Sequence, residues 1–491
     1  MTLTLRYEVL HLTLRDPFVI ARPDAGPQGQ ATTVIVELRD DRYPGLVGIG
    51  EGFPDRHHGE TPGTIEAAVP VLMDAVGAPH LTVPDLEDAA RRMALAIGHH
   101  GAAKCAIDIA LHDLGAQIAG QPLAEFLGLP PTGPPTDFTL GIDDPQVVAE
   151  RAGRANGFPS LKIKLGGPAD LDTLLAVRAV FDGPLRVDAN EAWDALEASR
   201  ILPHLERLGV ELIEQPFPAR RLDLLVALQA QTAIPVIADE SAVTIDDLPG
   251  LAGLVAGVNV KLAKCGGVGP ARRMLDEARR LGFRTLLGCR QETSVGIAAS
   301  ASLASLADWV DLDGNLLLDD DPFEGLDLGS DARWTPPPGP GLGLRRMDHG
   351  VADPANQAEH RSANVLGTVW AGVRTDRSNE MRAFVRDVLG APLIVDEPAM
   401  AIFRLGDTSL FEVLGQAWVD AVGYPTGPVV GFWVTNVDAA RSALEDAGTE
   451  LVGPTFADGD HRWQHFRAPD GNLYQVASGP YGPGVERITR A

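Results

Sequence analysis

The pattern of hydrophobic and polar residues divides the chain into parts of different character. Residues 1 to about 130 begin with two strands of alternating apolar and polar residues, Thr2–Leu14 and Thr32–Arg39, followed by apolar residues at helical spacing around Ile107. From residue 136 short apolar strands alternate with amphipathic helices. Strand–helix alternation favours a parallel sheet, and eight such units predict a closed (β/α)8 barrel. The predicted strands are Thr136–Leu140, Leu161–Leu165, Leu185–Asp188, Glu211–Glu214, Pro235–Asp239, Gly257–Leu262, Arg284–Gly288 and Trp309–Asp311.

A break follows the predicted barrel. Stacked prolines at 336–338 and a polar stretch without apolar periodicity predict a linker. Beyond it, two successive βαβββ patterns predict a smaller α+β domain. We therefore expect a capping domain over residues 1–130 with a closing segment at 320–346, the barrel over 131–319, a linker over 347–362, and the smaller domain over 363–485.

Composition and charge narrow the possible partners and compartments. The chain has 491 residues and a formal net charge of −26, which repels phosphate backbones and disfavours nucleic acid as a partner. Its three cysteines cannot form a closed disulfide framework, which fits a reducing compartment, and no apolar run is long enough to span a membrane. Since the N-terminus also lacks the features of a signal peptide, we expect a cytoplasmic protein without membrane partners.

Charged residues end several predicted barrel strands. Each lies one strand–helix unit beyond the previous one, with spacings of 24, 26, 25 and 22 residues, in the order Lys164, Asp188, Glu214, Asp239 and Lys261. Because catalytic groups of such barrels lie at the carboxyl ends of strands, we expect these side chains to converge on one mouth. Charges at the ends of apolar strands are costly unless they are paired or bind a metal.

The residue types indicate a reaction. Three carboxylates, Asp188, Glu214 and Asp239, form a hard-oxygen site that favours Mg2+, although each alone could instead cap the following helix. Lys164 and Lys261 lie on opposite sides of the predicted mouth, although each alone could be a solvated strand-end cation. Two such lysines could remove an α-proton from one face of a metal-stabilised enediolate and return it on the other, as racemases and epimerases require.

Several ordered motifs resemble the enolase superfamily, in its muconate-lactonising-like branch, over residues 1 to about 346. They are Lys162-Ile-Lys164, Asp188-Ala-Asn190, Glu214-Gln-Pro216, Asp239-Glu-Ser241, Asn259 to Gly267, the capping piece Val47 to Gly52, and Pro340 to Leu344. The resemblance implies one Mg2+ per barrel on the three carboxylates and acid/base roles for the two lysines. It also implies supporting roles for Asn190 and Glu240, and a homo-oligomer is possible. Lys162 shares a strand face with Lys164, and its like charge is expected to disfavour the protonated form of Lys164.

Within that branch the chain is most similar to dipeptide epimerases, such as those that act on L-Ala-D/L-Glu. The resemblance rests on Asp311-Leu-Asp313, a pair that holds the α-ammonium of the dipeptide in that family. Glu292, in the loop after the seventh strand, and Arg22, in a capping loop, are further expected substrate-binding residues. Alternatives within the superfamily are o-succinylbenzoate synthase, N-acylamino acid racemase and cycloisomerase chemistry, whose substrates lack a free α-ammonium.

The C-terminal part resembles the vicinal oxygen chelate fold of glyoxalases and bleomycin-resistance proteins. The resemblance rests on its duplicated βαβββ pattern and on Asp470-Gly-Asn-Leu-Tyr474. The positions that hold a metal in that family are Thr368, Glu412, Val429 and Gln475 here, and two expected histidines are absent. We therefore expect no metal site here, and a ligand-binding or interaction module without glyoxalase activity. A small-molecule binding or resistance protein led by this module is the alternative of another class.

Overall fold

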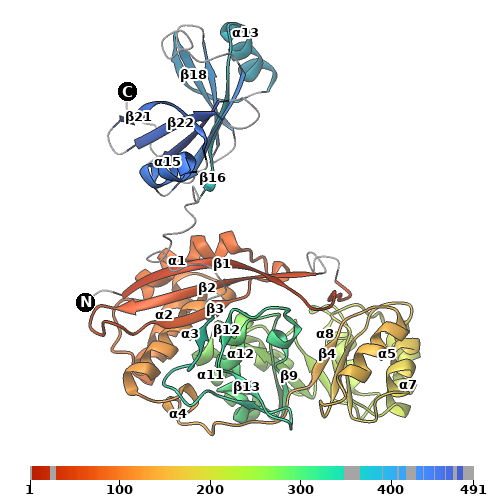
Figure 1. Cartoon of the computed structure of the whole chain (residues 1–491). Coiled ribbons are helices and arrows are strands. Elements are labelled where there is room, and N and C mark those ends of the chain that lie inside the picture. The colour runs from red at the N-terminus through yellow and green to blue at the C-terminus, as the bar shows by residue number, and fades with distance from the viewer. Residues whose placement is uncertain are drawn as a thin grey trace. The chain divides into compact units, whose positions relative to one another are not determined.

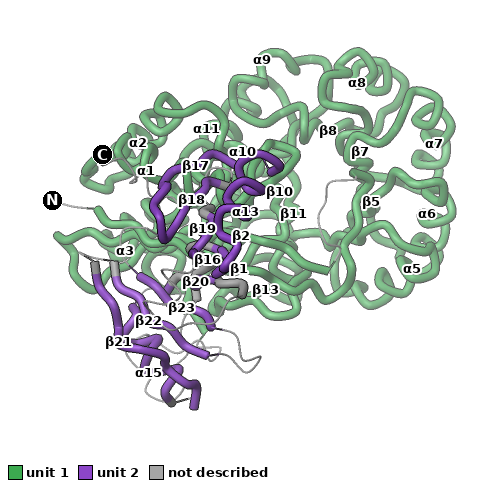
Figure 2. The backbone as a smooth tube through the Cα atoms, turned by 90° about the horizontal axis from the view of Figure 1, so that it is seen from above, with its two compact units in different colours: residues 1–349 green, residues 350–491 purple. Residues whose placement is uncertain are grey.

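The chain forms two compact units, residues 1–349 and 350–491 (Figure 2). The computed structural model describes residues 3–22, 29–347, 365–389, 391–405, 409–415, 427–434, 436–446, 448–458, 461–467 and 473–478. Apart from Met347, the predicted linker over 347–362 lies outside these residues. Within these ranges, no helix has the length and apolar character needed to cross a membrane.

The first unit opens with an antiparallel sheet covered by helices (Figure 1). Its elements are β1 (Leu3–Thr13), β2 (Gln30–Asp40), β3 (Gly48–Gly52), α1 (Pro62–Val76), α2 (Val83–Ala96), α3 (Gly101–Ala119) and the short α4 (Leu123–Phe126). Glycines let β3 lie directly against the buried α3, because a Cβ at Gly50 would come within 1.9 Å of the Ala106 carbonyl oxygen. This close contact fixes the sheet over the helices and completes the predicted capping domain.

Eight parallel strands follow in chain order, as the alternation predicts. They are β4 (Phe138–Leu140), β5 (Leu161–Lys164), β6 (Leu185–Asp188), β7 (Val210–Glu214), β8 (Val236–Ala238), β9 (Gly257–Lys261), β10 (Arg284–Gly288) and β11 (Trp309–Asp311). A parallel bridge between Thr136 and Val310 brings the first and last strands together. Nearly all residues of these strands are buried, the apolar ones as well as charged ones such as Lys162, Arg186 and Asp188.

Amphipathic helices surround the strands, with apolar residues turned toward the common core. They are α5 (Pro145–Arg154), α6 (Asp170–Arg178), α7 (Ala195–Arg207), α8 (Leu222–Gln229), α9 (Leu248–Leu251), α10 (Leu262–Cys265), α11 (Val268–Arg280) and α12 (Ser294–Ala301). Short strand pairs close the unit, β12 (Phe323–Glu324) with β15 (Arg345–Arg346) and β13 (Asp327–Leu328) with β14 (Trp334–Thr335). Glu51 of the capping domain accepts hydrogen bonds from the N-terminal amides of α12, Thr293 N at 3.0 Å and Gly296 N at 2.9 Å. The capping domain is thereby joined to the barrel.

The second unit contains one eight-stranded sheet built from two βαβββ halves. The first half holds β16 (Val365–Arg374), α13 (Ser378–Ala383), a π-helical turn (Phe384–Val388), β17 (Leu393–Glu397), β18 (Met400–Leu405) and β19 (Ser409–Leu414). The second holds β20 (Gly427–Val434), α15 (Val437–Asp446), β21 (Glu450–Asp458), β22 (His461–Arg467) and β23 (Leu473–Ser478). The first strands of the two halves, β16 and β20, pair at the middle of the sheet.

Candidate active site

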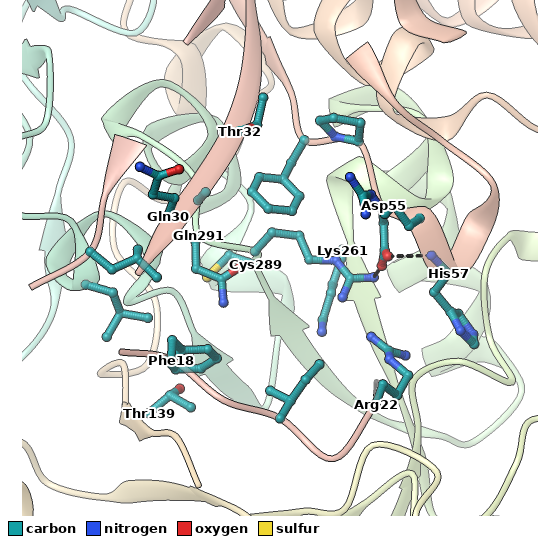
Figure 3. A pocket seen from close by; sticks show the side chains of 18 of the residues that line it. Phe18, Arg22, Gln30, Thr32, Asp55, His57, Thr139, Lys261, Cys289 and Gln291 are labelled. Atoms are coloured by element: carbon teal, nitrogen blue, oxygen red, sulfur yellow. Dashed lines mark hydrogen bonds and ion pairs between the residues drawn. The ribbon is translucent and has the colours of Figure 1, made fainter. Parts of the chain in front are cut away.

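A cavity of about 380 Å³ lies where the capping domain meets the carboxyl ends of the barrel strands. The capping domain contributes its rim residues, among them Phe18, Arg22 and Asp55, and the barrel contributes its floor. Figure 3 shows Lys261 in the middle, with Thr139, Phe18 and Cys289 on one side and Arg22, Asp55 and His57 on the other. The cavity therefore has two chemically different ends on either side of the predicted catalytic centre.

Strand register brings the predicted carboxylates together. Asp188 of β6 is paired in register with Lys164 of β5 and with Glu214 of β7, and Asp239 follows the last residue of β8 directly. All three carboxylates are fully buried. Because parallel strands in register present their side chains at the same height, the regular spacing in the sequence becomes one buried acidic cluster. The expected grouping is present.

Lysine ammonium groups compensate this acidic cluster. Lys164 Nζ lies 2.7 Å from Asp188 Oδ2, and Lys261 Nζ lies 2.8 Å from Asp239 Oδ2. Lys162 Nζ lies 2.7 Å from Glu214 Oε2 and 3.2 Å from Asp188 Oδ2. Buried carboxylates without such cations would carry a large desolvation penalty.

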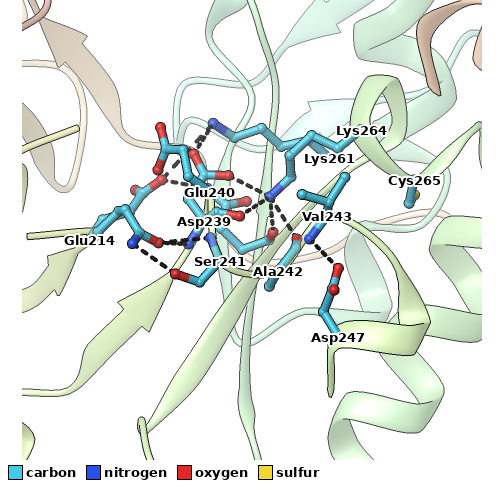
Figure 4. Close-up of polar contacts among 12 residues, drawn as sticks. Glu214, Asp239, Glu240, Ser241, Ala242, Val243, Asp247, Lys261, Lys264 and Cys265 are labelled. Carbon is cyan, nitrogen blue, oxygen red and sulfur yellow. Dashed lines mark hydrogen bonds and ion pairs between the residues drawn. The ribbon is translucent and has the colours of Figure 1, made fainter. Parts of the chain in front are cut away.

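A further lysine, Lys264, contacts one of the three carboxylates, Asp239 (Figure 4). Its Nζ donates to Asp239 Oδ1 at 2.5 Å, and also to three main-chain carbonyl oxygens at 2.7–3.0 Å, those of Asp239, Ala242 and Asn259. Lys264 lies in the motif Asn259 to Gly267, but the motif alone does not indicate its role. One signal was available: the chain has only five lysines, and four of them are Lys162, Lys164, Lys261 and Lys264.

The pKa values in the cluster follow from burial and these pairs. Burial and the charge of Asp188 raise the pKa of Glu214 to about 7. Burial would raise the pKa of Asp239 as well, but Lys261 and Lys264 outweigh it and hold that pKa well below its usual range. Burial disfavours the charged form of Lys162, yet its carboxylate neighbours raise its pKa well above the usual value.

The turns that follow β6 and β7 are strained. Asn190, Glu191 and Gln215 have φ angles of 43°, 73° and 29°, in the left-handed region that glycine favours. Hydrogen bonds maintain these turns: Asn190 N donates to Asp188 Oδ1 at 2.9 Å, and Gln215 Oε1 accepts from Asp239 N at 2.9 Å. Such strain persists only where the surroundings enforce it, and here it directs the carboxylates into the mouth.

The three carboxylates suit a divalent cation by their chemistry. Carboxylate oxygens are the ligands that Mg2+ prefers, and a buried group of three requires positive charge. Asn259 Nδ2 donates to Glu214 Oε1 at 2.7 Å and so orients one carboxylate from outside the group. Among the described residues, no three acidic, histidine or cysteine side chains form a ready-made ligand cluster. The lysine ammonium groups already contact these three carboxylates. A bound cation would replace part of the positive charge that the lysines supply.

Asp311 and Asp313 lie at the Thr139 end of the cavity. Asp313 Oδ2 accepts from Thr139 N at 2.5 Å, and Asp311 accepts from Thr139 Oγ1 at 3.2 Å and from Lys162 Nζ at 2.7 Å. Burial and the charge of Asp311 raise the pKa of Asp313 to about 7. Asp311 is thus tied to the lysine network, while Asp313 is the less compensated of the two carboxylates.

The remaining expected residues are placed as follows. Arg22 lines the cavity, and its Nη1 lies 2.5 Å from Glu240 Oε1. Asn190 Nδ2 donates to the same oxygen at 3.3 Å, so Asn190 and Glu240 connect the turn after β6 with the capping loop. Glu292 is buried. Among the described residues of its loop, Arg290 and Gln291 line the cavity and Glu292 does not. The orientation of the loop, which a motif does not specify, directs Glu292 elsewhere.

Known proteins resemble the first unit in both sequence and structure. The family described as mandelate racemase / muconate lactonizing enzyme, N-terminal domain, matches residues 4–128, and the enolase C-terminal domain-like family matches residues 146–348. An L-Ala-D/L-Glu epimerase of Bacteroides thetaiotaomicron is 36% identical over 340 residues, which cover 68% of this chain and 86% of that protein. An L-Lys-D/L-Arg epimerase of Methylococcus capsulatus is 38% identical over 353 residues, which cover 68% and 96%.

Solved structures agree with these matches. A dipeptide epimerase of Enterococcus faecalis, complexed with Mg and the dipeptide L-Leu-L-Tyr, superposes with a TM-score of 0.65 at 33% identity. The superposition covers 70% of this chain and all of that one. An N-succinyl Arg/Lys racemase of Bacillus cereus superposes with a TM-score of 0.64 at 28% identity, covering 71% and 96%.

Proposed function

The chain belongs to the mandelate racemase / muconate lactonizing enzyme family of the enolase superfamily, and from this premise we propose that it is a Mg2+-dependent dipeptide epimerase. The observation that carries the proposal is the placement of Lys164 and Lys261 around the buried carboxylates. Relatives named as dipeptide epimerases, and structures of such enzymes with Mg and dipeptides, support it. The reaction is an isomerisation at one α-carbon of the substrate.

The ring of strands gives the two lysines opposite positions. Lys164 ends β5 and Lys261 ends β9, four strands apart in a ring of eight. A substrate α-carbon held between them meets one amine on each face, so one lysine removes the α-proton and the other returns a proton from the opposite side. Mg2+, when bound by Asp188, Glu214 and Asp239, stabilises the negative charge that develops on the substrate carboxylate.

Lysine suits the removal and return of the α-proton. Arginine stays protonated and cannot accept a proton, whereas a lysine in a site of controlled charge can. The carboxylates beside the two lysines hold their ammonium forms in place before the substrate binds. With Asp188, Glu214 and Asp239 holding a divalent cation, Lys164 or Lys261 would be less strongly held by these carboxylates and could act as the base.

Asp311 and Asp313, at the Thr139 end of the cavity, favour a dipeptide over an N-acylated substrate. Asp311 and Asp313 suit a positively charged group, which a free α-ammonium provides and an N-acyl or succinyl group does not. To test the proposal, epimerisation of L,L-dipeptides is compared with racemisation of N-succinyl amino acids before and after removal of Mg2+ with a chelator. Metal-dependent turnover of dipeptides supports the proposal, and turnover of N-succinyl amino acids alone contradicts it.

We propose that the second unit is a vicinal oxygen chelate-like, small-molecule binding module without a metal. Two βαβββ halves joined through β16 and β20 support this assignment. Of the four positions considered, Thr368 and Val429 have side chains outside the described set, and Glu412 and Gln475 offer one carboxylate and one amide. Mn2+ titration of the full chain carrying Asp188→Asn and Glu214→Gln tests this, since a remaining stoichiometric site would contradict it.

We propose that the protein is cytoplasmic and that it forms a homo-oligomer. The three cysteines, Cys105, Cys265 and Cys289, are all free, which fits a reducing compartment. Size-exclusion chromatography with light scattering measures the oligomeric state directly.

A further inference from the structure

A buried ion pair inside the barrel joins Arg186 of β6 to Asp137, which directly precedes β4. Arg186 Nη1 lies 2.8 Å from Asp137 Oδ2, and the two side chains are 7% and 0% exposed. Arg186 comes two residues before Asp188, and Asp137 comes two residues before Thr139. Since side chains two residues apart on a strand share a face, the pair lies one layer below the floor of the cavity. Barrel interiors are usually filled by branched apolar side chains, so two buried charges here need a reason.

The pair lies at the seam where the first and last strands of the barrel meet. Among the described residues, β4 and β11 are joined by an isolated bridge between Thr136 and Val310 and not by a continuous ladder. Arg186 Nη1 donates to the carbonyl oxygen of Val310 at 3.1 Å as well as to Asp137 Oδ2. One guanidinium nitrogen therefore contacts both sides of the seam and adds its hydrogen bonds to those of the bridge.

The expected site for the α-ammonium group is built across the same seam. Thr139 belongs to β4, whereas Asp311 ends β11 and directly follows Val310. Asp311 Oδ1 accepts from Thr139 Oγ1 at 3.2 Å, and Asp313 Oδ2 accepts from Thr139 N at 2.5 Å. A shift of β11 against β4 would therefore displace these carboxylates from Thr139. That Asp311 and Asp313 receive an α-ammonium belongs to the proposed dipeptide epimerisation, and the inference rests on that function.

The pair also affects the charge beside Asp311. Burial and the charge of Asp311 raise the pKa of Asp137 well above its usual range, while Arg186 opposes this rise. The other cation at Asp311 is Lys162, whose Nζ lies 2.7 Å from Asp311 Oδ2 and also 2.7 Å from Glu214 Oε2. Because Lys162 is shared between carboxylates, Arg186 supplies positive charge that Asp137 would otherwise draw from it.

We propose that Arg186 and Asp137 are positioning residues that hold Thr139 and Asp311 in place for the α-ammonium group of the dipeptide. Neither touches the reacting atoms, and both act through the strand ends above them. A binding site is effective only when its groups are held close to the productive geometry by the residues behind them. Loss of the pair should therefore weaken binding of the ammonium group and leave the proton transfer itself unchanged.

The first experiment replaces Asp137 by alanine and by asparagine. Asp137 is the member to change, because Arg186 lies two residues from the proposed metal ligand Asp188. In Asp137→Ala, Arg186 keeps the Val310 carbonyl oxygen and also Glu211 Oε2, which lies 2.8 Å from its Nε. We expect KM for a dipeptide to rise roughly 10- to 100-fold with little change in kcat, the effect of a small misplacement of a binding group. Asp137→Asn keeps an oxygen acceptor for Arg186 and should restore most of the affinity.

The second experiment compares two ligands that differ only in the α-ammonium group. The best substrate among L-Ala-L-Glu, L-Ala-L-Lys and L-Ala-L-Leu is paired with the N-propionyl amino acid that has the same C-terminal residue. The propionyl compound is measured as a competitive inhibitor. In Asp137→Ala, KM for the dipeptide should rise while Ki for the propionyl compound stays nearly constant, because that compound has no group for the ammonium site. A merely structural role would weaken both ligands equally.

The matched control is Arg284→Met, which removes an arginine that contacts β11 away from the seam. The guanidinium carbon of Arg284 lies 3.6 Å from the ring centre of Trp309, and neither KM nor Ki should change in this variant. Equal changes for the two ligands in Asp137→Ala, an unchanged KM, no rescue by asparagine, or the same selective loss in Arg284→Met overturns the inference.

A further variant covers the case in which Asp137→Ala does not fold. Arg186→Lys keeps the positive charge but lacks the planar guanidinium, so it should show the same selective rise in KM. Constant KM and Ki in a folded Arg186→Lys overturns the inference while the epimerase function stands. Absence of wild-type turnover with every dipeptide overturns the proposed function, and the inference with it.

Discussion

Replacement of Lys264 by methionine should destabilise the first unit strongly, because the ammonium group of Lys264 is buried. The substitution keeps the length of the side chain and removes its ammonium group. It leaves Asp239 Oδ1 and three main-chain carbonyl oxygens without the donor that now lies 2.5–3.0 Å away. Loss of one partner of a buried ion pair costs about 3–5 kcal/mol, because the other charge stays buried.

The matched control is Lys104→Met, since Lys104 is the only lysine of the chain outside the site. Its Nζ donates to the carbonyl oxygens of Ile97 and His99 at 2.7 and 2.6 Å, near the surface, and makes no ion pair in the described part of the chain. Water can replace it there, so we expect a loss of about 1 kcal/mol.

Urea unfolding followed by circular dichroism measures both variants at neutral pH without added metal. We expect Lys264→Met to lose about 3–5 kcal/mol in the free energy of unfolding, with a melting temperature lower by roughly 5–15 °C. Calorimetric titration should also show Mg2+ binding weakened by about 10- to 100-fold, because Lys264 orients a proposed ligand. If Lys264→Met unfolds within 1 kcal/mol of Lys104→Met, the reasoning about the buried ammonium is wrong.

Three further predictions concern pH and domain organisation. Because the pKa of Asp313 is raised to about 7, KM for a dipeptide should rise as the pH falls below 7, and kinetics of Asp313→Asn should lack this dependence. Burial raises the pKa of Asp113 to about 6, so the folded state binds more protons than the unfolded state between about pH 4 and 6. The free energy of unfolding should therefore fall by up to about 3 kcal/mol as the pH rises through that window, and Asp113→Asn should remove that part of the slope in urea titrations. Truncation after Met347 should keep epimerase turnover, because every residue that lines the cavity lies before it; loss of turnover in a folded, Mg2+-binding truncation would contradict this.

The barrel could be predicted because its signal is local and repeated. Six of the eight strands end in a charged residue or are directly followed by one, and the observed strands differ from the predicted ones by a few residues at their ends. A regular spacing of one strand–helix unit predicts that the ends of neighbouring strands lie side by side. In the structure the three strand-end residues Lys164, Asp188 and Glu214 are in register.

The sequence was less informative at the edges of the second sheet. β17 and β21 are the two outermost strands, and their bounds do not follow from the duplicated βαβββ pattern. β17 reads Leu-Ile-Val-Asp-Glu and is exposed at both ends, so it lacks the clear alternation of a strand with one buried face. Edge strands often carry charge because their open side faces solvent.

Contacts between distant segments could not be predicted from spacing. Arg290 and Asp55 are 235 residues apart, and only the closure of the capping domain over the barrel brings them together. Lys264 lies three residues after Lys261, yet its partners are known only once the turn after β9 is folded. Side-chain pairs that are buried and polar depend on packing, which a pattern of residue types does not specify.

Deuterium incorporation from D2O tests the two-lysine account most directly. Each L,L-dipeptide substrate and its epimer are incubated with Mg2+ and the wild-type enzyme, Lys164→Ala or Lys261→Ala, and exchange at the α-carbon is measured by mass spectrometry and NMR. We predict that the wild type labels and interconverts both epimers, while neither variant interconverts them and each labels at most one epimer, a different one for each variant. Interconversion of the epimers by either variant, or exchange of the same epimer by both, would show that the two lysines do not act on opposite faces of the α-carbon.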